Sequence, residues 1–208
     1  MKAFIYTGGE ILPENITERP AEGDLIIAAD CGLQNATRMG VVPTVVLGDF
    51  DSLPKSAEIP EDAEILQVPA EKDETDTQLA VSLAISRGAK DIVIIGGIGG
   101  RLDHTVSNLA ILEDLDRRMI HGLMVSGYNR ARFLRNNSTL IPRSGYNYFG
   151  ILAADPVVKG VSAEGVKYPL KKAKLERYNQ YAVSNEIVGN CALIDVRRGG
   201  VWIVESKE

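Results

Sequence analysis

Short apolar segments that each run into a polar or glycine-rich cluster most restrict the fold of the first part of the chain. Residues 24–30 and 91–95 are almost entirely apolar, and strands without polar alternation are usually buried on both faces, as in a parallel sheet. Helix-like segments lie between such strands, and this alternation predicts a parallel, Rossmann-like sheet with crossover connections. Strands are expected at residues 2–7, 24–30, 45–47, 65–68 and 91–95.

Three helices are expected between or after these strands. The first spans about residues 31–40, where the closing glycine suits a helix end. The second is apolar-rich over residues 79–85, with Asp73 or Thr75 as its N-cap. The third spans residues 105–119, and its expected inner stripe is Val106, Leu109, Ala110, Leu112 and Leu115.

The segment after the third strand carries two carboxylates, Asp49 and Asp51. In extended backbone they point to the same side, where they repel each other unless a cation lies between them or one is protonated. Mg²⁺ is the usual hard cation for such a pair and normally accompanies a phosphate substrate. A solvated turn explains this segment equally well, because Gly, Asp and Ser are turn residues.

Four clusters follow the carboxyl ends of expected strands, and in parallel sheets ligands bind beyond those ends. They are therefore expected to form one site. The clusters are Asp30, the pair Asp49 and Asp51, residues 72–76, and residues 96–104.

The glycine-rich segment 96–100 can bring backbone N–H groups close to a phosphate. It has neither the P-loop ending nor the dinucleotide-binding spacing, so for this segment alone a tight turn is the favoured explanation. Arg101 favours phosphate binding, because a guanidinium fits phosphate oxygens. Asp103 is suited to capping the next helix, and His104 follows it directly.

Asp73 and Asp76 are three residues apart and share a face if the helix has begun. Compensation of the helix dipole explains either acid alone. It does not explain Lys72 beside them, nor the further carboxylates expected at the same site, and one or two metal ions would explain that excess.

The character of the sequence changes near residue 121. Beyond it lie short apolar runs separated by Gly, Asn, Ser and Pro, which indicate an all-β domain, most simply a sandwich. The expected domains are residues 1–121 (α/β) and 122–208 (β-sandwich). The expected strands of the second domain are residues 123–125, 132–134, 139–141, 146–152, 157–161, 166–170, 190–196 and 201–204.

Composition excludes some functions. The net charge of −5 gives no support for nucleic-acid binding. No apolar stretch approaches membrane-spanning length, and the N-terminal apolar run is too short for a signal peptide. The two cysteines, Cys31 and Cys191, do not suggest a disulfide framework. A cytoplasmic protein is the expectation.

Assembled in order, these clusters closely resemble the thiamine pyrophosphokinase family. The family's Gly-Asp-Phe-Asp-Ser, Lys-Asp-x-Thr-Asp and Gly-Arg-x-Asp-His elements match residues 48–52, 72–76 and 100–104, and Asn108 follows. Residues 29–32 resemble its Ala-Asp-Gly-Gly element, with Cys31 in place of a glycine. Residues 165–170 and 184–186 resemble its substrate-side elements.

The resemblance implies a kinase that transfers the diphosphate of ATP to the hydroxyl of thiamine and releases AMP. It also implies a homodimer whose active site lies at the subunit interface. The alternatives are a diphosphokinase acting on a pterin alcohol and a non-catalytic nucleotide- or thiamine-binding module.

The same resemblance assigns roles to individual residues. The expected catalytic residues are Asp49, Asp51, Asp73, Asp76 and Arg101, and the expected Mg²⁺ ligands are Asp49, Asp51 and Asp76. Thiamine is expected to contact Gln78, Ser184 and Asn185. The expected ATP-binding residues are Asp30, Gly32, Lys72, Thr75, Gly97, Gly99, Gly100, Arg101, Asp103, His104 and Asn108.

Overall fold

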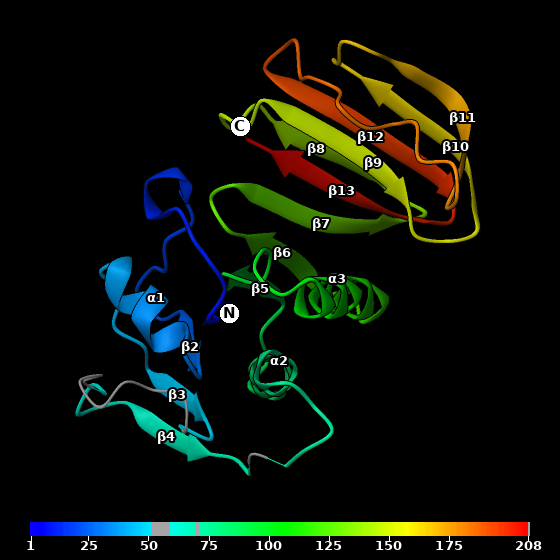
Figure 1. The fold of residues 1–208 in the computed structure, drawn as a ribbon. Coiled ribbons are helices and arrows are strands. Elements are labelled where there is room, and N and C mark those ends of the chain that lie inside the picture. Colours follow the sequence, from blue (N-terminus) through cyan, green and yellow to red (C-terminus); the bar gives the residue numbers. More distant parts are fainter. Residues whose placement is uncertain (51–58, 70, 208) are drawn as a thin grey trace. The chain divides into compact units, whose positions relative to one another are not determined.

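The computed structural model of the chain describes residues 1–50, 59–69 and 71–207. It forms two compact units, Met1–Gly127 and Tyr128–Glu208. Figure 1 shows the helices confined to the first unit and strands alone in the second. The boundary inferred from the sequence falls earlier, after residue 121, because the apolar run at 123–125 was assigned to the β domain. In the structure this run pairs with a strand of the first unit.

The first unit contains a parallel sheet in the order β4-β3-β2-β1-β5-β6. Each pairing within it is parallel, and Tyr6 lies between Ala28 and Ile95 in register. This is a doubly wound order, and the expected α/β class is confirmed. The strands are β1 (Lys2–Tyr6), β2 (Leu25–Ala29), β3 (Val45–Gly48), β4 (Glu64–Gln67), β5 (Asp91–Ile95) and β6 (His121–Val125).

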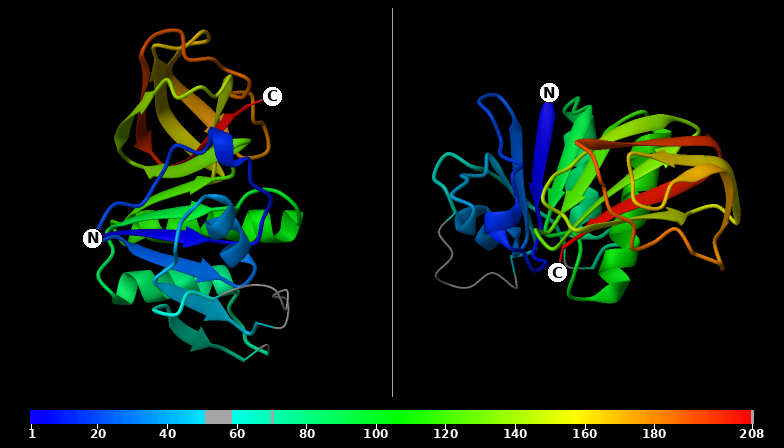
Figure 2. Two further views of the ribbon diagram at one scale, coloured as in Figure 1. Left: turned by 90° about the vertical axis from the view of Figure 1, so that its left-hand side faces the viewer. Right: turned by 90° about the horizontal axis from the view of Figure 1, so that it is seen from above.

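Helices cover both faces of this sheet. Figures 1 and 2 show α1 (Gly32–Arg38) on one face and α2 (Asp76–Ser86) and α3 (Leu102–Arg117) on the other. On the α1 side, Ala36 and Met39 pack against Phe4 and Tyr6 of β1. A short 3-10 helix, η1 (Pro13–Asn15), follows β1.

The start of α2 is fixed by a capping box, which selects Thr75 rather than Asp73 as the N-cap. Thr75 Oγ1 accepts a hydrogen bond from the Gln78 N–H, and Gln78 Oε1 accepts one from the Thr75 N–H. Two of the helix's unpaired N–H groups are thereby satisfied. The capping box thus places the start of α2 at Asp76, the last residue of the cluster at residues 72–76.

Helix α3 begins one turn earlier than expected, and its buried face differs from the predicted stripe. Val106 is 59% exposed, and Ala110 is exposed as well. The buried face instead contains Asn108 and Ile111 together with Leu112 and Leu115. The prediction is therefore right for Leu112 and Leu115 and wrong for Val106 and Ala110. The polar Asn108 takes an inward position instead, where it donates a hydrogen bond to the Gly97 carbonyl.

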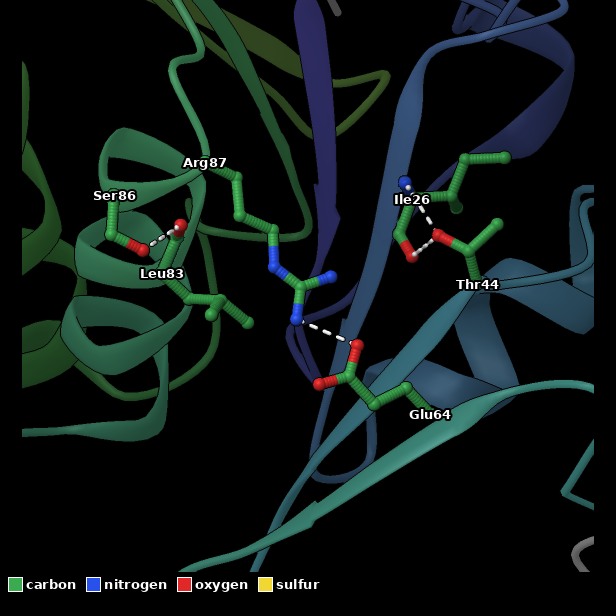
Figure 3. A network of polar contacts seen from close by, with 6 residues as sticks. All are labelled: Ile26, Thr44, Glu64, Leu83, Ser86 and Arg87. Carbon is green, nitrogen blue, oxygen red and sulfur yellow. Dashed lines mark hydrogen bonds and ion pairs between the residues drawn. The ribbon is translucent and has the colours of Figure 1, made fainter.

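The edge strand β4 is mostly exposed and is fixed by polar contacts (Figure 3). Arg87 Nη2, at the end of α2, lies 2.6 Å from Glu64 Oε2. The same view shows a contact between the neighbouring strands: Thr44 Oγ1, just before β3, accepts a hydrogen bond from the N–H of Ile26 on β2 and donates one to the Ile26 carbonyl. Charged side chains on an edge strand also discourage pairing with another chain.

The second unit is a sandwich of two antiparallel sheets, as expected. One contains β7 (Asn129–Arg135), β13 (Gly200–Ser206) and β9 (Tyr148–Ala153), and the other has the order β11-β10-β12-β8. Apolar residues of both sheets form one core, including Ile203 and Ile194. The strands of the second sheet are β8 (Ser138–Pro142), β10 (Val157–Glu164), β11 (Leu170–Glu176) and β12 (Cys191–Arg198).

One predicted strand of this unit is misplaced. Residues 166–170 were expected to be a strand, whereas the strand begins at Leu170 and runs to Glu176. It was missed because it carries three lysines, Lys171, Lys172 and Lys174, and few apolar residues. Only Leu175 is fully buried in it, which suits an edge strand rich in lysine. Within the described ranges, the structure contains no helix that could span a membrane.

Candidate active site

The candidate site is a pocket of about 510 Å³ in the first unit. In the sheet order, β1 lies between β2 and β5, so the chain reverses direction of winding at β1 and β5. Ligands of doubly wound sheets bind at this point, outside the carboxyl ends of the strands. The pocket is lined by Thr7, Gly8, Gly9, Glu10, Ala29, Asp30, Cys31, Asp49, Lys72, Glu74, Thr75, Asp76, Thr77, Gly96, Gly97, Gly99, Gly100, Arg101, His104 and Asn108.

Four sequence clusters therefore meet in one pocket, as expected. The ends of β2, β3 and β5 contribute Asp30, Asp49 and the glycine-rich loop, and residues 72–76 come from the loop before α2. Asp51 lies outside the described residues. Gly32, Asp73, Gln78 and Asp103 do not line the pocket.

Two glycine-containing loops form the floor of the pocket and touch each other. A Cβ on Gly9 would lie 1.9 Å from the Gly96 carbonyl oxygen. Gly96 itself has φ +84°, which favours glycine. The backbones of the loops after β1 and β5 can approach this closely only because both positions lack a side chain.

Gly32 has a related structural role under the pocket. A Cβ there would lie 1.9 Å from the Tyr6 carbonyl oxygen. The glycine thus lets the first turn of α1 pack against the end of β1. Gly32 was expected to contact ATP, but it does not line the pocket. It permits the close packing of α1 on β1 beneath the pocket.

Two buried asparagines hold the loops in place. Asn35 Nδ2, on α1, donates to the carbonyls of Thr7 and Gly9, both at 2.7 Å. Asn108 Nδ2, on α3, donates to the Gly97 carbonyl at 2.9 Å. These bonds satisfy the carbonyls of both loops from within the protein and hold the loops against α1 and α3.

The acidic wall of the pocket contains an ion pair between Asp76 and Lys72. Asp76 Oδ1 is buried and has no hydrogen-bond donor, although Lys72 Nζ lies 2.9 Å away as an ion pair. Lys72 Nζ donates instead to the Pro69 carbonyl. The Lys72 ammonium therefore supplies the positive charge that compensates this buried oxygen.

A complete metal site is not formed by the described residues alone. Among residues 1–50, 59–69 and 71–207, no group of three or more His, Cys, Asp or Glu side chains is arranged to hold an ion.

Asp30, at the end of β2, has φ +48°, a conformation that non-glycine residues rarely adopt. Such backbone strain is found preferentially at functional sites.

Arg101 and Asp103 form a bidentate ion pair at the exposed rim. Arg101 Nη2 lies 2.6 Å from Asp103 Oδ2, and Nε donates to Oδ1 at 3.2 Å. The hydrogen bond raises the pKa of Arg101 and lowers the pKa of Asp103. Asp103 was expected to cap α3, but the N-cap position is Arg101, and the Asp103 carboxylate accepts hydrogen bonds from Arg101 and from the His104 N–H. Its expected contact with the nucleotide stays a prediction. It orients the guanidinium at the edge of the pocket.

The residues expected to contact thiamine lie outside the pocket. Gln78 serves the capping box of α2. In the second unit, Ser184 is exposed with φ +55°. Asn185 is buried: its Nδ2 donates to the Tyr168 carbonyl, and its Oδ1 accepts from the N–H groups of Tyr168 and Glu186. The Asn185 amide thus holds two loops of this unit together.

Sequence reasoning missed the loop after β1, which contributes Thr7, Gly8, Gly9 and Glu10 to the pocket. A signal was present, because two glycines directly follow the first strand. Without the strand order, nothing indicated that β1 borders the point where the winding reverses. Thr77 was also missed, although it directly follows the expected cluster at residues 72–76, and Glu74 of that cluster had been given no role of its own.

The assembled pocket combines glycine-rich loops and a guanidinium with a carboxylate wall. The loops and Arg101 suit the oxygens of a polyphosphate. The carboxylates suit a hard divalent cation that such a polyphosphate brings.

Comparisons with known proteins agree with this architecture. Residues 19–123 match the family model described as thiamin pyrophosphokinase, catalytic domain, and residues 138–201 match the thiamin pyrophosphokinase vitamin B1 binding domain. The chain is 26% identical to thiamine pyrophosphokinase of Bacillus subtilis over 210 residues, which cover 98% of each.

Solved structures of similarly named proteins have the same fold. The Bacillus subtilis thiamine pyrophosphokinase structure has a TM-score of 0.90 at 22% identity, with all of both chains covered. The thiamin pyrophosphokinase structure from Geobacillus thermodenitrificans has a TM-score of 0.86 at 25% identity, covering 100% of this chain and 98% of the other.

Proposed function

This chain belongs to the thiamin pyrophosphokinase family, and we propose that it transfers the diphosphate of ATP to the hydroxyl of thiamine, giving thiamine diphosphate and AMP. The observation that carries the proposal is the pocket at the carboxyl ends of β1 and β5. Most of its lining comes from the segment that matches the catalytic-domain model. We propose a cytoplasmic enzyme.

In this reaction the thiamine oxygen bonds to the β-phosphorus of ATP while the bond from that phosphorus to the AMP oxygen breaks. Such a transfer needs little covalent chemistry from the protein, so positioning and charge neutralisation dominate. The loops at Gly8–Gly9 and Gly96–Gly100 would hold the polyphosphate, and Arg101 would exchange Asp103 for phosphate oxygens. Lys72 would add a second positive charge.

We propose that Asp49, Asp51 and Asp76 hold Mg²⁺. The donor set contains only carboxylate oxygens, which suit a hard cation, and both Asp49 and Asp76 line the pocket. When bound, the ion would neutralise charge on the phosphates and help to orient them. We propose that Asp73, which lies beside Lys72 but does not line the pocket itself, helps to accept the thiamine proton or orients water on the ion.

We propose that thiamine binds the second unit, since residues 138–201 match the vitamin B1 binding model. The exposed Ser184 hydroxyl is the better candidate for a direct contact with the aminopyrimidine. Asn185, whose amide is already hydrogen-bonded, would position the loop that carries Ser184. We further propose a homodimer, in which the β unit of one subunit faces the nucleotide pocket of its partner.

The test is AMP release from ATP and Mg²⁺, with and without thiamine, combined with mass detection of the product. Thiamine-dependent AMP together with thiamine diphosphate is the expected result. AMP release that requires a pterin alcohol instead would keep the chemistry and change the acceptor. ATP binding without AMP release, whatever the acceptor, would contradict the catalytic assignment.

A further inference from the structure

The second unit contains a basic pocket of about 700 Å³ that has no part in the proposed reaction. Among the residues that the structure describes, its lining has four cationic side chains and no carboxylate, although the whole chain has a net charge of −5. A local excess of one charge in a concave site attracts ligands of the opposite charge. We call it the basic pocket; it is lined by Asn136, Lys159, Gly160, Lys172, Arg197 and Arg198.

The cations of the basic pocket have no acidic partners within the described ranges. Other lysines of this unit do have them, because Lys167 pairs with Glu186 and Lys174 with Glu176. Asp195, two residues before Arg197 on β12, does not line the pocket. The positive charges are therefore left for solvent or for a ligand.

The strand register places like charges opposite one another. On β10, Lys159 lies directly opposite Arg198 of β12 on one side and opposite Lys174 of β11 on the other. Figure 1 shows these three strands side by side. Like charges at directly opposed positions destabilise a sheet. An anion bound between Lys159 and Arg198 would replace this repulsion between the two cations with attraction of each to the anion.

The backbone around the basic pocket is also strained. Lys172 and Asn136 both have φ +49°, and the register of β10 shifts between Lys159 and Val161. Between them Gly160 has φ +70°, and a Cβ there would lie 2.8 Å from the Arg197 Cβ. Bulges and left-handed residues of this kind re-aim side chains at functional sites.

We propose that the basic pocket binds a small di- or triphosphate anion. Arginine and lysine side chains make charge-assisted hydrogen bonds to phosphate oxygens. Asn136 can add a neutral donor, since its Oδ1 already accepts from the Gly199 N–H and its Nδ2 is left over. The pocket volume lies in the range of small-molecule sites. The acidic chain as a whole disfavours an extended nucleic acid or membrane surface as the partner.

The experiment titrates inorganic triphosphate into the intact protein by calorimetry, with EDTA to remove metal ions. The variant Lys159→Gln/Arg197→Gln removes two charges from the basic pocket. The matched control Arg143→Gln/Lys171→Gln removes one arginine and one lysine of the same unit that do not line it. The nucleotide pocket of the first unit is unchanged in all three proteins.

We expect one more triphosphate per chain in the wild type and the control than in the pocket variant. The affinity of that site should fall on the order of 100-fold when two charge-assisted contacts are lost. Equal binding by all three proteins, or no second site in the wild type, would overturn the proposal.

Thermal unfolding gives a second test, because the substitutions should affect the melting temperature in opposite directions without and with the anion. Without anion, the pocket variant should melt at or above the wild-type temperature, because like-charge repulsion is relieved. Added triphosphate should raise the melting temperature of the wild type more than that of the variant. If this variant fails to fold, Lys172→Gln/Arg198→Gln replaces it. Binding to vesicles with anionic phospholipids, without binding of free triphosphate, would contradict the small-anion assignment.

Discussion

Replacing Gly9 with alanine tests whether the loops after β1 and β5 form one preorganised phosphate site. The added methyl group would lie 1.9 Å from the Gly96 carbonyl oxygen, whereas real Cβ contacts essentially never fall below 3.0 Å. The two loops must therefore separate by about 1 Å, and Asn35 would lose part of its hold on the Gly9 carbonyl.

Both stability and activity should respond. Overpacking of this kind costs about 1–3 kcal/mol of unfolding free energy, and each kcal/mol lowers Tm by roughly 2–4 °C in a chain of this size. Because a misplacement of about 1 Å can cost on the order of 100-fold in rate, kcat/KM for ATP should fall by about that factor.

The assays are product formation and thermal unfolding, with Gly189→Ala as the matched control. At Gly189 the backbone is not left-handed, and among the described residues an added Cβ would have one neighbour within 4 Å, the Cys191 carbonyl oxygen at 3.9 Å. The control should keep its activity and change its unfolding free energy by less than about 1 kcal/mol. Wild-type activity and stability in Gly9→Ala would refute the close approach of the two loops.

Three further substitutions test other parts of the structure. Asn35→Ala leaves the buried Thr7 carbonyl and the half-buried Gly9 carbonyl without this donor, so urea denaturation should show a loss of roughly 2–3 kcal/mol. A loss below 0.5 kcal/mol (roughly, the level of a surface change) would contradict this. Asp76→Asn should reduce Mg²⁺-dependent AMP formation by about 10²–10³-fold while the Tm without ligands stays nearly unchanged, since its ion pair with Lys72 is partly exposed; a large drop in Tm would mark the residue as structural. Asp155 accepts hydrogen bonds from Arg135 and from the Gly200 N–H, which lower its pKa. The stabilisation by the ionised Asp155 is therefore present above its unfolded pKa and is lost as the pH falls through the lower folded pKa. Asp155→Asn should reduce the free energy of unfolding by roughly 1 kcal/mol at pH 7, and this difference from the wild type should shrink below about pH 4. A difference that does not depend on pH would count against this account.

Much of the first unit was predictable because its signals are local. Uninterrupted apolar runs identify buried strands, and a parallel sheet brings their carboxyl ends together. That is why Asp30, Asp49 and the loop at residues 96–100 were expected in one site and are found in one pocket.

The remainder depends on contacts between distant residues. The strand order makes the loop after β1 part of the pocket, and this order is set by non-local pairing of β1 with β2 and β5. Asn185 carries a side chain that suits either a ligand or a structural bond, and only the folded loops show its amide bonded to Tyr168. Strand β11 was missed because lysines dominate it, and pairing with β10 rather than apolar content makes it a strand.

The most direct test of the proposed function uses ATP labelled in both its β- and γ-phosphates, with thiamine and Mg²⁺. A single diphosphate transfer predicts that both labels enter the thiamine product in equal amounts and that one unlabelled AMP forms per product. Release of ADP, or a product carrying only the γ-label, would contradict attack at the β-phosphorus and with it the proposed role of the pocket.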